Sequence, residues 1–263
     1  MGMDLDFKPF SGVGIVSFYR RNPSTGLPSS GGYDLGETVK LDITNTAPKL
    51  EMNTSRSAER GVAFSMAQSK TGAVAIELKT VNDFIWGLLT SGSWTEAAAG
   101  GAVTGWTAPS GLVAGQFIKL PHQNVSGLVI KDSAGSPATL VAGTDYETGT
   151  DPLIAGAFKL KNVTGFTQPF KVDYTPGAVK ILGSFKAPDE DFIVFFDGTN
   201  AYDNSRILTE VFRFRFAPEG AMSMVSDGSQ FPTYTLNGSI QKDETKPANS
   251  AGGQYYKMVK PGA

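Results

Sequence analysis

Apolar and polar side chains alternate one residue at a time in several segments that lie far apart along the chain. This pattern occurs in residues 38–44, 74–79, 210–216 and 233–241. Successive side chains of a β-strand point to opposite faces of a sheet, so a period of two residues predicts strands with one apolar and one polar face. In the first segment, Val39, Leu41 and Ile43 would share the apolar face. The pattern predicts a mainly β protein with a sheet that is packed on one face and solvated on the other.

One segment has helical spacing instead. Thr80 is predicted to cap this short helix, with Asp83 at its third position and Gly92 at its end. A helix of this length is not stable alone, so it would cover the apolar face of the sheet and dock by its Phe84 and Trp86 side. Its apolar residues at helical spacing are Val81, Phe84, Ile85, Leu88 and Leu89.

The composition changes after this helix. Residues 93–108 are rich in Ala, Gly and Thr, as in a linker. Short apolar runs separated by turn residues follow as far as residue 178 and predict a small inserted β-sandwich. We therefore expect a β-sandwich or barrel domain from residues 1–93 and 179–263, ending in a C-terminal arm, with an outer β-domain inserted at 94–178.

Few side chains are suited to catalysis or metal binding. The chain has no Cys and one His, His122, so thiolate and His-rich metal sites are excluded. His122 lies in a turn-like stretch, where a structural or solvated role is expected. The run Asp189–Asp191 could bind a hard cation, but adjacent carboxylates of an extended segment point to opposite faces, so a solvated charge run is preferred. We predict no catalytic residue, no cofactor and no metal, and therefore no enzyme.

Two other motifs have structural interpretations. Gly12 and Gly14 lack the third glycine and the following helix of a phosphate-binding loop, so they predict a bulge or a close backbone approach. Arg56 and Arg60 have no interleaved aromatic residues, which favours a polar loop or an intersubunit loop over a nucleic-acid patch.

The charge balance argues against binding of nucleic acid as a purpose. The 23 basic and 25 acidic side chains give a net charge of −2, so no overall field attracts a polyanion. The first six residues lack the basic and apolar regions of an export signal. No apolar run approaches the roughly 20 residues that span a bilayer. We expect a protein made in a cytoplasm, with no membrane partner.

The order of the segments is more informative than any single residue. The features are, in chain order, the strand Gly14–Arg20, the loop Asn22–Pro28 with its Pro-x-Thr-Gly-x-Pro character, Tyr33–Thr38 at a strand entry, Pro48–Ser57, and Thr80–Phe84 at the helix start. Over residues 10–240 this order resembles the major tail tube proteins of siphovirus-type, long-tailed bacteriophages. The insert, with residues 120–125 and 143–147, is similar to the extra β-domain of some members.

The resemblance implies a structural protein of the virion tail, synthesised in the cytoplasm of a bacterial host. In that family, subunits form hexameric rings with a continuous inner β-barrel, and the rings stack into a tube that passes DNA during ejection without sequence-specific binding. Partners would be further copies of the chain, together with tape-measure, tail-terminator and distal tail proteins. The inserted domain would project outward.

The resemblance also suggests roles for three groups of residues. A conduit for DNA needs a wall without net positive charge, and the residues expected to line it are Thr38, Lys40, Asp42, Thr44, Glu77 and Lys79. The residues expected between subunits, away from the lumen, are Arg56, Arg60, Arg213 and Arg215. The residues expected between rings, on a long polar loop, are Asn22, Thr25, Leu27 and Tyr33.

Other interpretations remain open. The main alternative is a monomeric β-sandwich module that binds carbohydrate or a surface, with its polar strand faces in solvent. A glycoside hydrolase would need two carboxylates at a defined separation, and the sequence singles out no such pair. A tube of a contractile tail or secretion system would share the fold.

Overall fold

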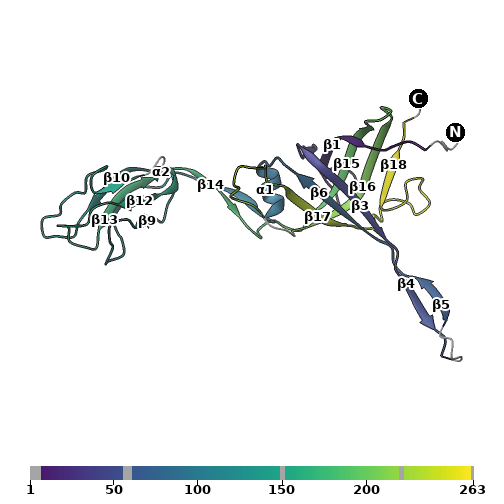
Figure 1. Cartoon of the computed structure of the whole chain (residues 1–263), viewed down its shortest axis with the longest axis horizontal. Coiled ribbons are helices and arrows are strands. Elements are labelled where there is room, and N and C mark those ends of the chain that lie inside the picture. The colour runs from purple at the N-terminus through teal and green to yellow at the C-terminus, as the bar shows by residue number, and fades with distance from the viewer. Residues whose placement is uncertain (1–6, 56–60, 149–151, 219–221, 262–263) are drawn as a thin grey trace. The chain divides into compact units, whose positions relative to one another are not determined.

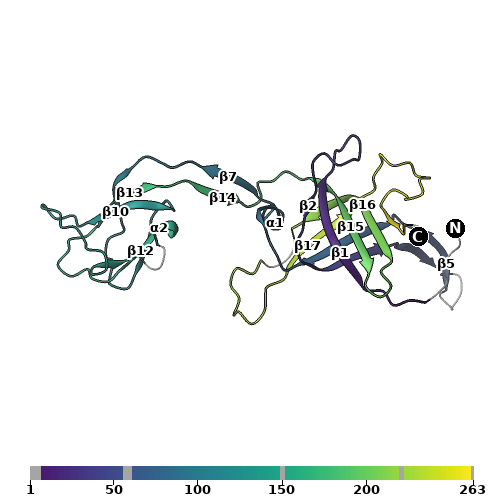
Figure 2. The ribbon, with the colours of Figure 1, turned by 90° about the horizontal axis from the view of Figure 1, so that it is seen from above.

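Strands dominate the computed structural model, which describes residues 7–55, 61–148, 152–218 and 222–261. The prediction of a mainly β protein is confirmed. The chain divides into two compact units, Met1–Ser93 with Gly183–Ala263, and Trp94–Leu182. The predicted insert, residues 94–178, lies within the second unit. Figures 1 and 2 show the elements of both units.

The first unit is built on one eight-stranded antiparallel sheet with the order β2-β1-β15-β16-β17-β6-β3, in which β18 also pairs with β16. Its strands are β1 (Gly12–Arg20), β2 (Tyr33–Asp34), β3 (Thr38–Thr46), β6 (Thr71–Leu78), β15 (Asp191–Asn200), β16 (Arg206–Ala217), β17 (Tyr234–Ile240) and β18 (Tyr256–Val259). A separate two-stranded hairpin consists of β4 (Lys49–Asn53) and β5 (Val62–Ala67). None of the sheets closes into a barrel within the described residues.

The sheet folds over so that strands from its two halves share one core. Val16 and Phe18 of β1 belong to the same buried cluster as Ile76 and Leu78 of β6, although these strands lie far apart in the strand order. The bend falls where β16 changes partner, because Leu208–Val211 pairs with β18 and Phe214–Ala217 pairs with β17. The alternating strands therefore pack their apolar faces against each other.

The predicted helix is present as α1 (Asp83–Leu89), but Thr80 does not cap it. Asn82 is the N-cap, and its side-chain oxygen accepts a hydrogen bond from the Ile85 amide at 2.9 Å. Thr80 instead accepts a hydrogen bond from the Glu37 amide at 2.9 Å and so ties the chain before β3 to the end of β6. The helix ends at Leu89 with Thr90 as C-cap, two residues before the predicted Gly92.

The helix docks by a wider surface than the predicted Phe84 and Trp86 side. Ile85 is its buried residue, and Phe84, Leu88 and Leu89 pack on the same core cluster. Phe84 also stacks on Tyr33, with ring centroids 4.0 Å apart. Trp86 lies edge-on to Tyr234 of β17 at 5.5 Å.

The second unit has two three-stranded sheets, β10-β13-β8 and β11-β12-β9, around one core. Its elements are β7 (Ser93–Ala97), β8 (Val103–Thr107), β9 (Phe117–Lys119), β10 (Val125–Lys131), β11 (Tyr146–Glu147), α2 (Pro152–Ala155), β12 (Ala157–Leu160), β13 (Lys171–Pro176) and β14 (Val179–Gly183). Strands β7 and β14 pair where the chain enters and leaves the unit. The expectation of a single helix was wrong, since α2 is a second one. The sequence did not reveal α2, because a four-residue helix is too short to show helical periodicity.

Phe214 lies at the centre of the first core. It is fully buried, contacts Phe18 at a ring-centroid distance of 5.5 Å, and occupies the space beside Gly238. We predict that Phe214→Ala lowers the free energy of unfolding by about 3–5 kcal/mol, because it leaves a cavity in a rigid core. Denaturant unfolding would measure this, with Phe185→Ala as the control at a side chain that is 80% exposed. Equal effects of the two substitutions would contradict this core assignment.

Candidate assembly surfaces

The polar face of β3 and β6 carries most of the residues predicted to line a lumen. Register pairs Lys40 with Glu77, Asp42 with Ala75 and Thr44 with Ala73, so these side chains share one face. Lys40 Nζ lies 2.8 Å from Asp42 and 3.7 Å from Glu77. The hydrogen bond and charge of Asp42, with the charge of Glu77, raise the pKa of Lys40. The lysine is therefore positively charged at neutral pH, and the carboxylates of Asp42 and Glu77 balance its charge.

Two of the residues predicted to line the lumen, Thr38 and Lys79, lie at the ends of these strands and do not share the paired positions of the others. A bulge between Thr38 and Lys40 pairs Thr38 with Leu78, on the packed side of the sheet. The same bulge leaves Val39 half exposed, whereas the sequence pattern placed it on the packed face. Lys79 follows the last residue of β6 and is exposed.

The arginines of β16, which were expected at an intersubunit contact away from the lumen, lie on the same polar face as Lys40, Asp42 and Glu77. Register pairs Glu77 with Thr235 and Ser239 with Arg215, which places Arg215 on the face of Glu77. The Asp191 carboxylate accepts hydrogen bonds from Arg213 Nε at 2.6 Å and from Arg215 Nε at 2.8 Å. Both arginines are thus paired within their own chain, with one carboxylate between two guanidinium groups.

Asp191 is therefore not part of a solvated charge run. Its side chain is only 11% exposed and it begins β15. Glu190 lies 3.4 Å from Arg20. The described residues contain no group of three or more His, Asp or Glu side chains able to hold a metal ion. His122 Nδ1 lies 2.9 Å from the Tyr174 hydroxyl, in the second unit.

Strand β1 has one edge that is largely unpaired. The Ser11 carbonyl accepts a hydrogen bond from Ala201, on the β15 side, whereas the Val16 carbonyl accepts one from Leu35, on the opposite side. Main-chain groups alternate in direction along an antiparallel strand, so those of Gly12 and Gly14 face away from β15. Strand β2 covers this edge only at Ser17 and Phe18. In the described part of the chain, the first half of β1 therefore lacks an outer partner strand.

Gly14 also has the predicted close backbone approach. A Cβ atom at this position would lie 2.2 Å from the Asp197 carbonyl oxygen, so only glycine fits against β15 here. At the other end of the strand order, β3 pairs with β6 and, within the described chain, with no second strand. Among the described residues, the first half of β1 and the whole of β3 are thus open edges of the sheet.

The loop predicted to join rings is held to its own chain. Asn22 accepts hydrogen bonds from the Ser24 and Thr25 amides, and its own amide donates to the Leu27 carbonyl. Leu27 is exposed, whereas Tyr33 belongs to β2 and stacks on Phe84. Arg56 and Arg60, predicted between subunits, lie outside the described residues.

A buried ion pair anchors this loop to the C-terminal segment. Arg21 Nη2 lies 2.5 Å from Asp243 Oδ1, and both side chains are almost completely buried. The Thr245 amide and hydroxyl also donate to Asp243 Oδ1. Burial alone would raise the pKa of Asp243, but the hydrogen bonds from Thr245 and Arg21 outweigh it and lower that pKa. The segment that leads to β18 is therefore fixed to the end of β1.

Sequence analysis did not identify the β4–β5 hairpin as a surface feature. Large apolar residues alternate with polar or small ones in both strands around a polar connection, which is a hairpin signal. Figure 1 shows the hairpin continuing beyond β3 and β6. Register places Leu50 opposite Met66 and Met52 opposite Phe64, so all four share one face. All four are more than half exposed.

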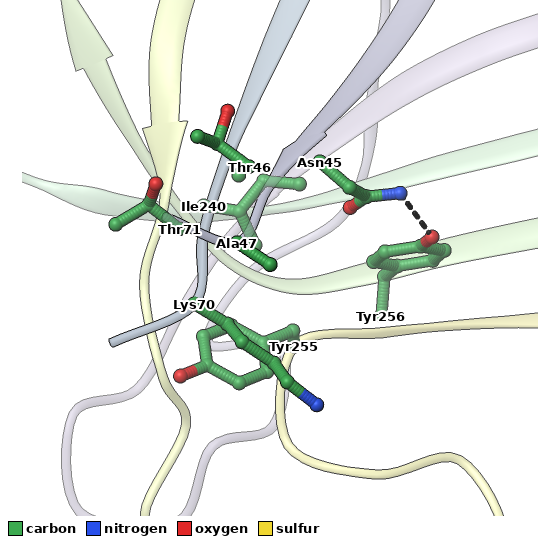
Figure 3. A pocket seen from close by; sticks show the side chains of 9 residues that line it. Asn45, Thr46, Ala47, Lys70, Thr71, Ile240, Tyr255 and Tyr256 are labelled. Atoms are coloured by element: carbon green, nitrogen blue, oxygen red, sulfur yellow. Dashed lines mark hydrogen bonds between the residues drawn. The ribbon is translucent and has the colours of Figure 1, made fainter. Parts of the chain in front are cut away.

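An apolar pocket of about 210 Å³ lies at the base of this hairpin. Figure 3 shows its walls, with the Tyr255 and Tyr256 rings on one side and Ile240 and Ala47 on another. Asn45 Nδ2 donates to the Tyr256 hydroxyl at 2.8 Å and fixes that ring. Lys70 lies at the rim. The remaining lining residues are Thr46, Thr71 and Gly72.

The comparison with known families covers almost the whole chain. The sequence profile of the family described as "Protein of unknown function UCP028589" matches residues 9–259. The chain belongs to this family. A search of curated proteins finds no match to it. No helix among the described residues is long and apolar enough to span a membrane.

We predict that Asp243→Ala lowers stability by about 3–5 kcal/mol, because it leaves the Arg21 charge buried without its partner. The double variant Arg21→Met, Asp243→Leu should recover most of this loss, because neither charge then has to be desolvated. Denaturant unfolding at neutral pH would measure both variants. A double variant as unstable as Asp243→Ala would contradict the account.

The ion pair also predicts a pH dependence. Because folding lowers the pKa of Asp243, its contribution to stability is complete above the ordinary carboxyl pKa of 3.8. The contribution is lost as the pH falls through the lower pKa of the folded state. The stability difference between the wild type and the double variant should therefore change in this acidic range and be constant between pH 5 and 8.

Proposed function

We propose that this chain is a structural subunit that assembles with copies of itself into stacked hexameric rings, and that these form the tail tube of a long-tailed bacteriophage. The observation that carries the proposal is a sheet with a polar outer face on β3 and β6 and with unpaired edges at β3 and at the first half of β1. Unpaired strand edges invite pairing with another chain, and closure of strands into a barrel removes them. The resemblance in segment order supplies the identity of the tube.

The open edge of β3 in one copy would pair with the open half of β1 in the next. Joining the β3 edge of each copy to the β1 edge of the next repeats the same rotation, and a rotation that closes produces a ring. A barrel with many strands encloses an aqueous channel, because its interior becomes too wide for side chains to fill. The bore would be lined by the polar face that carries Lys40, Asp42 and Glu77.

The charges of that face suit the passage of DNA. Basic side chains that grip phosphates release counterions and slow a moving duplex. Lys40 is held between two carboxylates, and Asp191 lies between Arg213 and Arg215. The second unit would stand outside the bore. The tape-measure, tail-terminator and distal tail proteins would be the other partners, and the virion tail the location.

The edge proposal predicts the effect of one proline. Gly12→Pro should raise the concentration needed for assembly at least about ten-fold, because it removes a main-chain donor from the open edge of β1. The fold should be kept, because this group does not face β15 and an added Cβ meets side-chain atoms of Phe10 and Phe196 but no backbone. Sedimentation velocity over a concentration series would measure assembly. Circular dichroism would check the fold.

Gly101→Pro is the matched control, because Gly101 lies in the second unit with free space around it. It should leave assembly unchanged. Normal assembly of a folded Gly12→Pro variant would contradict the edge pairing. A wild-type protein that stays a monomer of 27.8 kDa at high concentration would instead favour a monomeric binding module.

The lumen assignment predicts a gain of DNA binding. Asp42→Lys with Glu77→Lys turns a compensated face into a basic one, repeated in every subunit. Assemblies of this variant should retain duplex DNA in co-sedimentation at low salt and release it as salt rises, whereas wild-type assemblies should not retain it. The control makes the same charge change in the second unit, with Glu96→Lys and Glu147→Lys. Equal retention by the two variants would argue against the lumen assignment.

A further inference from the structure

The β4–β5 hairpin presents an apolar face that its own chain leaves uncovered. Leu50, Met52, Phe64 and Met66 lie on that face with exposed fractions between 55% and 71%. Two-stranded hairpins are marginally stable in water by themselves. An exposed row of large apolar side chains on a projecting element is typical of an interaction surface. The hairpin therefore needs a partner on this face.

The pocket at the hairpin base has the size and chemistry to accept one of these side chains. An apolar cavity of about 150 Å³ holds a benzene molecule, and this pocket measures about 210 Å³. Its walls are apolar and aromatic, with Ile240, Tyr255 and Tyr256 as the largest residues. Phe64, which is 71% exposed, is the aromatic side chain of the hairpin face.

The hairpin does not reach the pocket of its own molecule. Phe64 precedes the pocket residue Lys70 by six positions on a chain that runs from β5 into β6. At about 3.4 Å per residue, the ring lies roughly 20 Å from the pocket, along a strand that points away from it. Figure 1 shows the hairpin extending away from β3 and β6. The partner must therefore be another molecule.

We infer that Phe64 of one copy inserts into the pocket formed by Ala47, Ile240 and Tyr255 of a neighbouring copy. A projection on one part of a molecule that fits a pocket elsewhere on the same molecule makes a heterologous contact, which propagates from copy to copy. This inference rests on the proposed self-assembly and names a contact that the edge pairing does not include.

The contact is an addition to the edge pairing and not a substitute for it. The four side chains would cover roughly 400–600 Å², less than the roughly 800 Å² that each partner contributes to a stable interface. When the edge pairing already holds two copies together, a second, smaller contact between the same copies forms within the complex. It therefore increases the overall affinity even if it is weak alone. Phe64 would then act as the central aromatic anchor of a mostly apolar contact.

Cysteine crosslinking tests the contact directly, because the chain has no Cys of its own. A Phe64→Cys variant and an Ala47→Cys variant are mixed at a concentration at which Phe64→Cys alone assembles, and are treated with a short bismaleimide. The expected product has twice the mass of the chain and yields a peptide that joins position 64 to position 47. A mixture of Phe185→Cys and Ala47→Cys is the control, because Phe185 is exposed but lies outside the hairpin.

Complementation of two defects gives a second measure. Phe64→Ala removes the inserted ring, and Ala47→Phe fills the pocket, so each should raise the concentration needed for assembly at least ten-fold. An equimolar mixture should assemble at a lower concentration than either variant alone, because one supplies the ring and the other the pocket. Phe231→Ala, at another exposed aromatic side chain, should have no effect.

The outcomes separate this inference from the proposed function. If the wild type assembles, absence of the 64-to-47 crosslink in the mixture of cysteine variants overturns the inserted ring and leaves the tube proposal standing. Normal assembly of folded Phe64→Ala has the same consequence. Loss of assembly in Phe231→Ala but not in Phe64→Ala overturns it as well. A wild-type chain that never assembles overturns both.

Discussion

The unpaired main-chain groups along the first half of β1 and along β3 are the feature on which the proposed assembly depends. A strand edge carries unpaired donors and acceptors, which favour pairing with another chain unless the edge is covered, charged or bulged. Strand β2 covers β1 over only two residues, and within the described chain β3 keeps one side unpaired. Both edges belong to a well-packed sheet, so a copy of the same chain is the simplest partner.

The packing of the first unit holds these edges in place. Gly14 brings β1 against the Asp197 carbonyl, and Gly238 leaves room for the Phe214 ring. Arg21 and Asp243 tie the end of β1 to the segment that leads into β18. On the polar face of each chain, Lys40 lies between two carboxylates and Asp191 lies between two guanidinium groups. A chain built in this way has fixed open edges and a polar face whose charges are paired within the chain.

The fold class and the inserted unit followed from local patterns. Alternation identified β3, β6, β16 and β17, because their two faces meet different environments. The bulge at Val39 was not visible, since an extra residue in a strand leaves no mark on composition. The sequence predicted Thr80 as the helix cap, whereas Asn82 is the cap in the structure. Both residue types cap helices, and Thr80 is distinguished only by its tertiary hydrogen bond from the Glu37 amide.

The candidate surfaces were harder to predict than the fold. The pairing of Arg213 and Arg215 with Asp191 depends on which strands are neighbours, and this information is not local. The hairpin has the same alternation of large apolar residues as the buried strands. The sequence therefore did not indicate that its apolar face is exposed. The pocket combines residues near positions 46, 71, 240 and 255, which only the fold brings together.

An electron-microscopy reconstruction of the concentrated wild-type protein would show whether the strand edges of neighbouring copies pair. We expect closed rings, stacked into tubes, in which β3 of one copy is hydrogen-bonded to the first half of β1 of the next, with Lys40, Asp42 and Glu77 facing the bore. Separate particles of 27.8 kDa, or assemblies in which both edges remain unpaired, would contradict it.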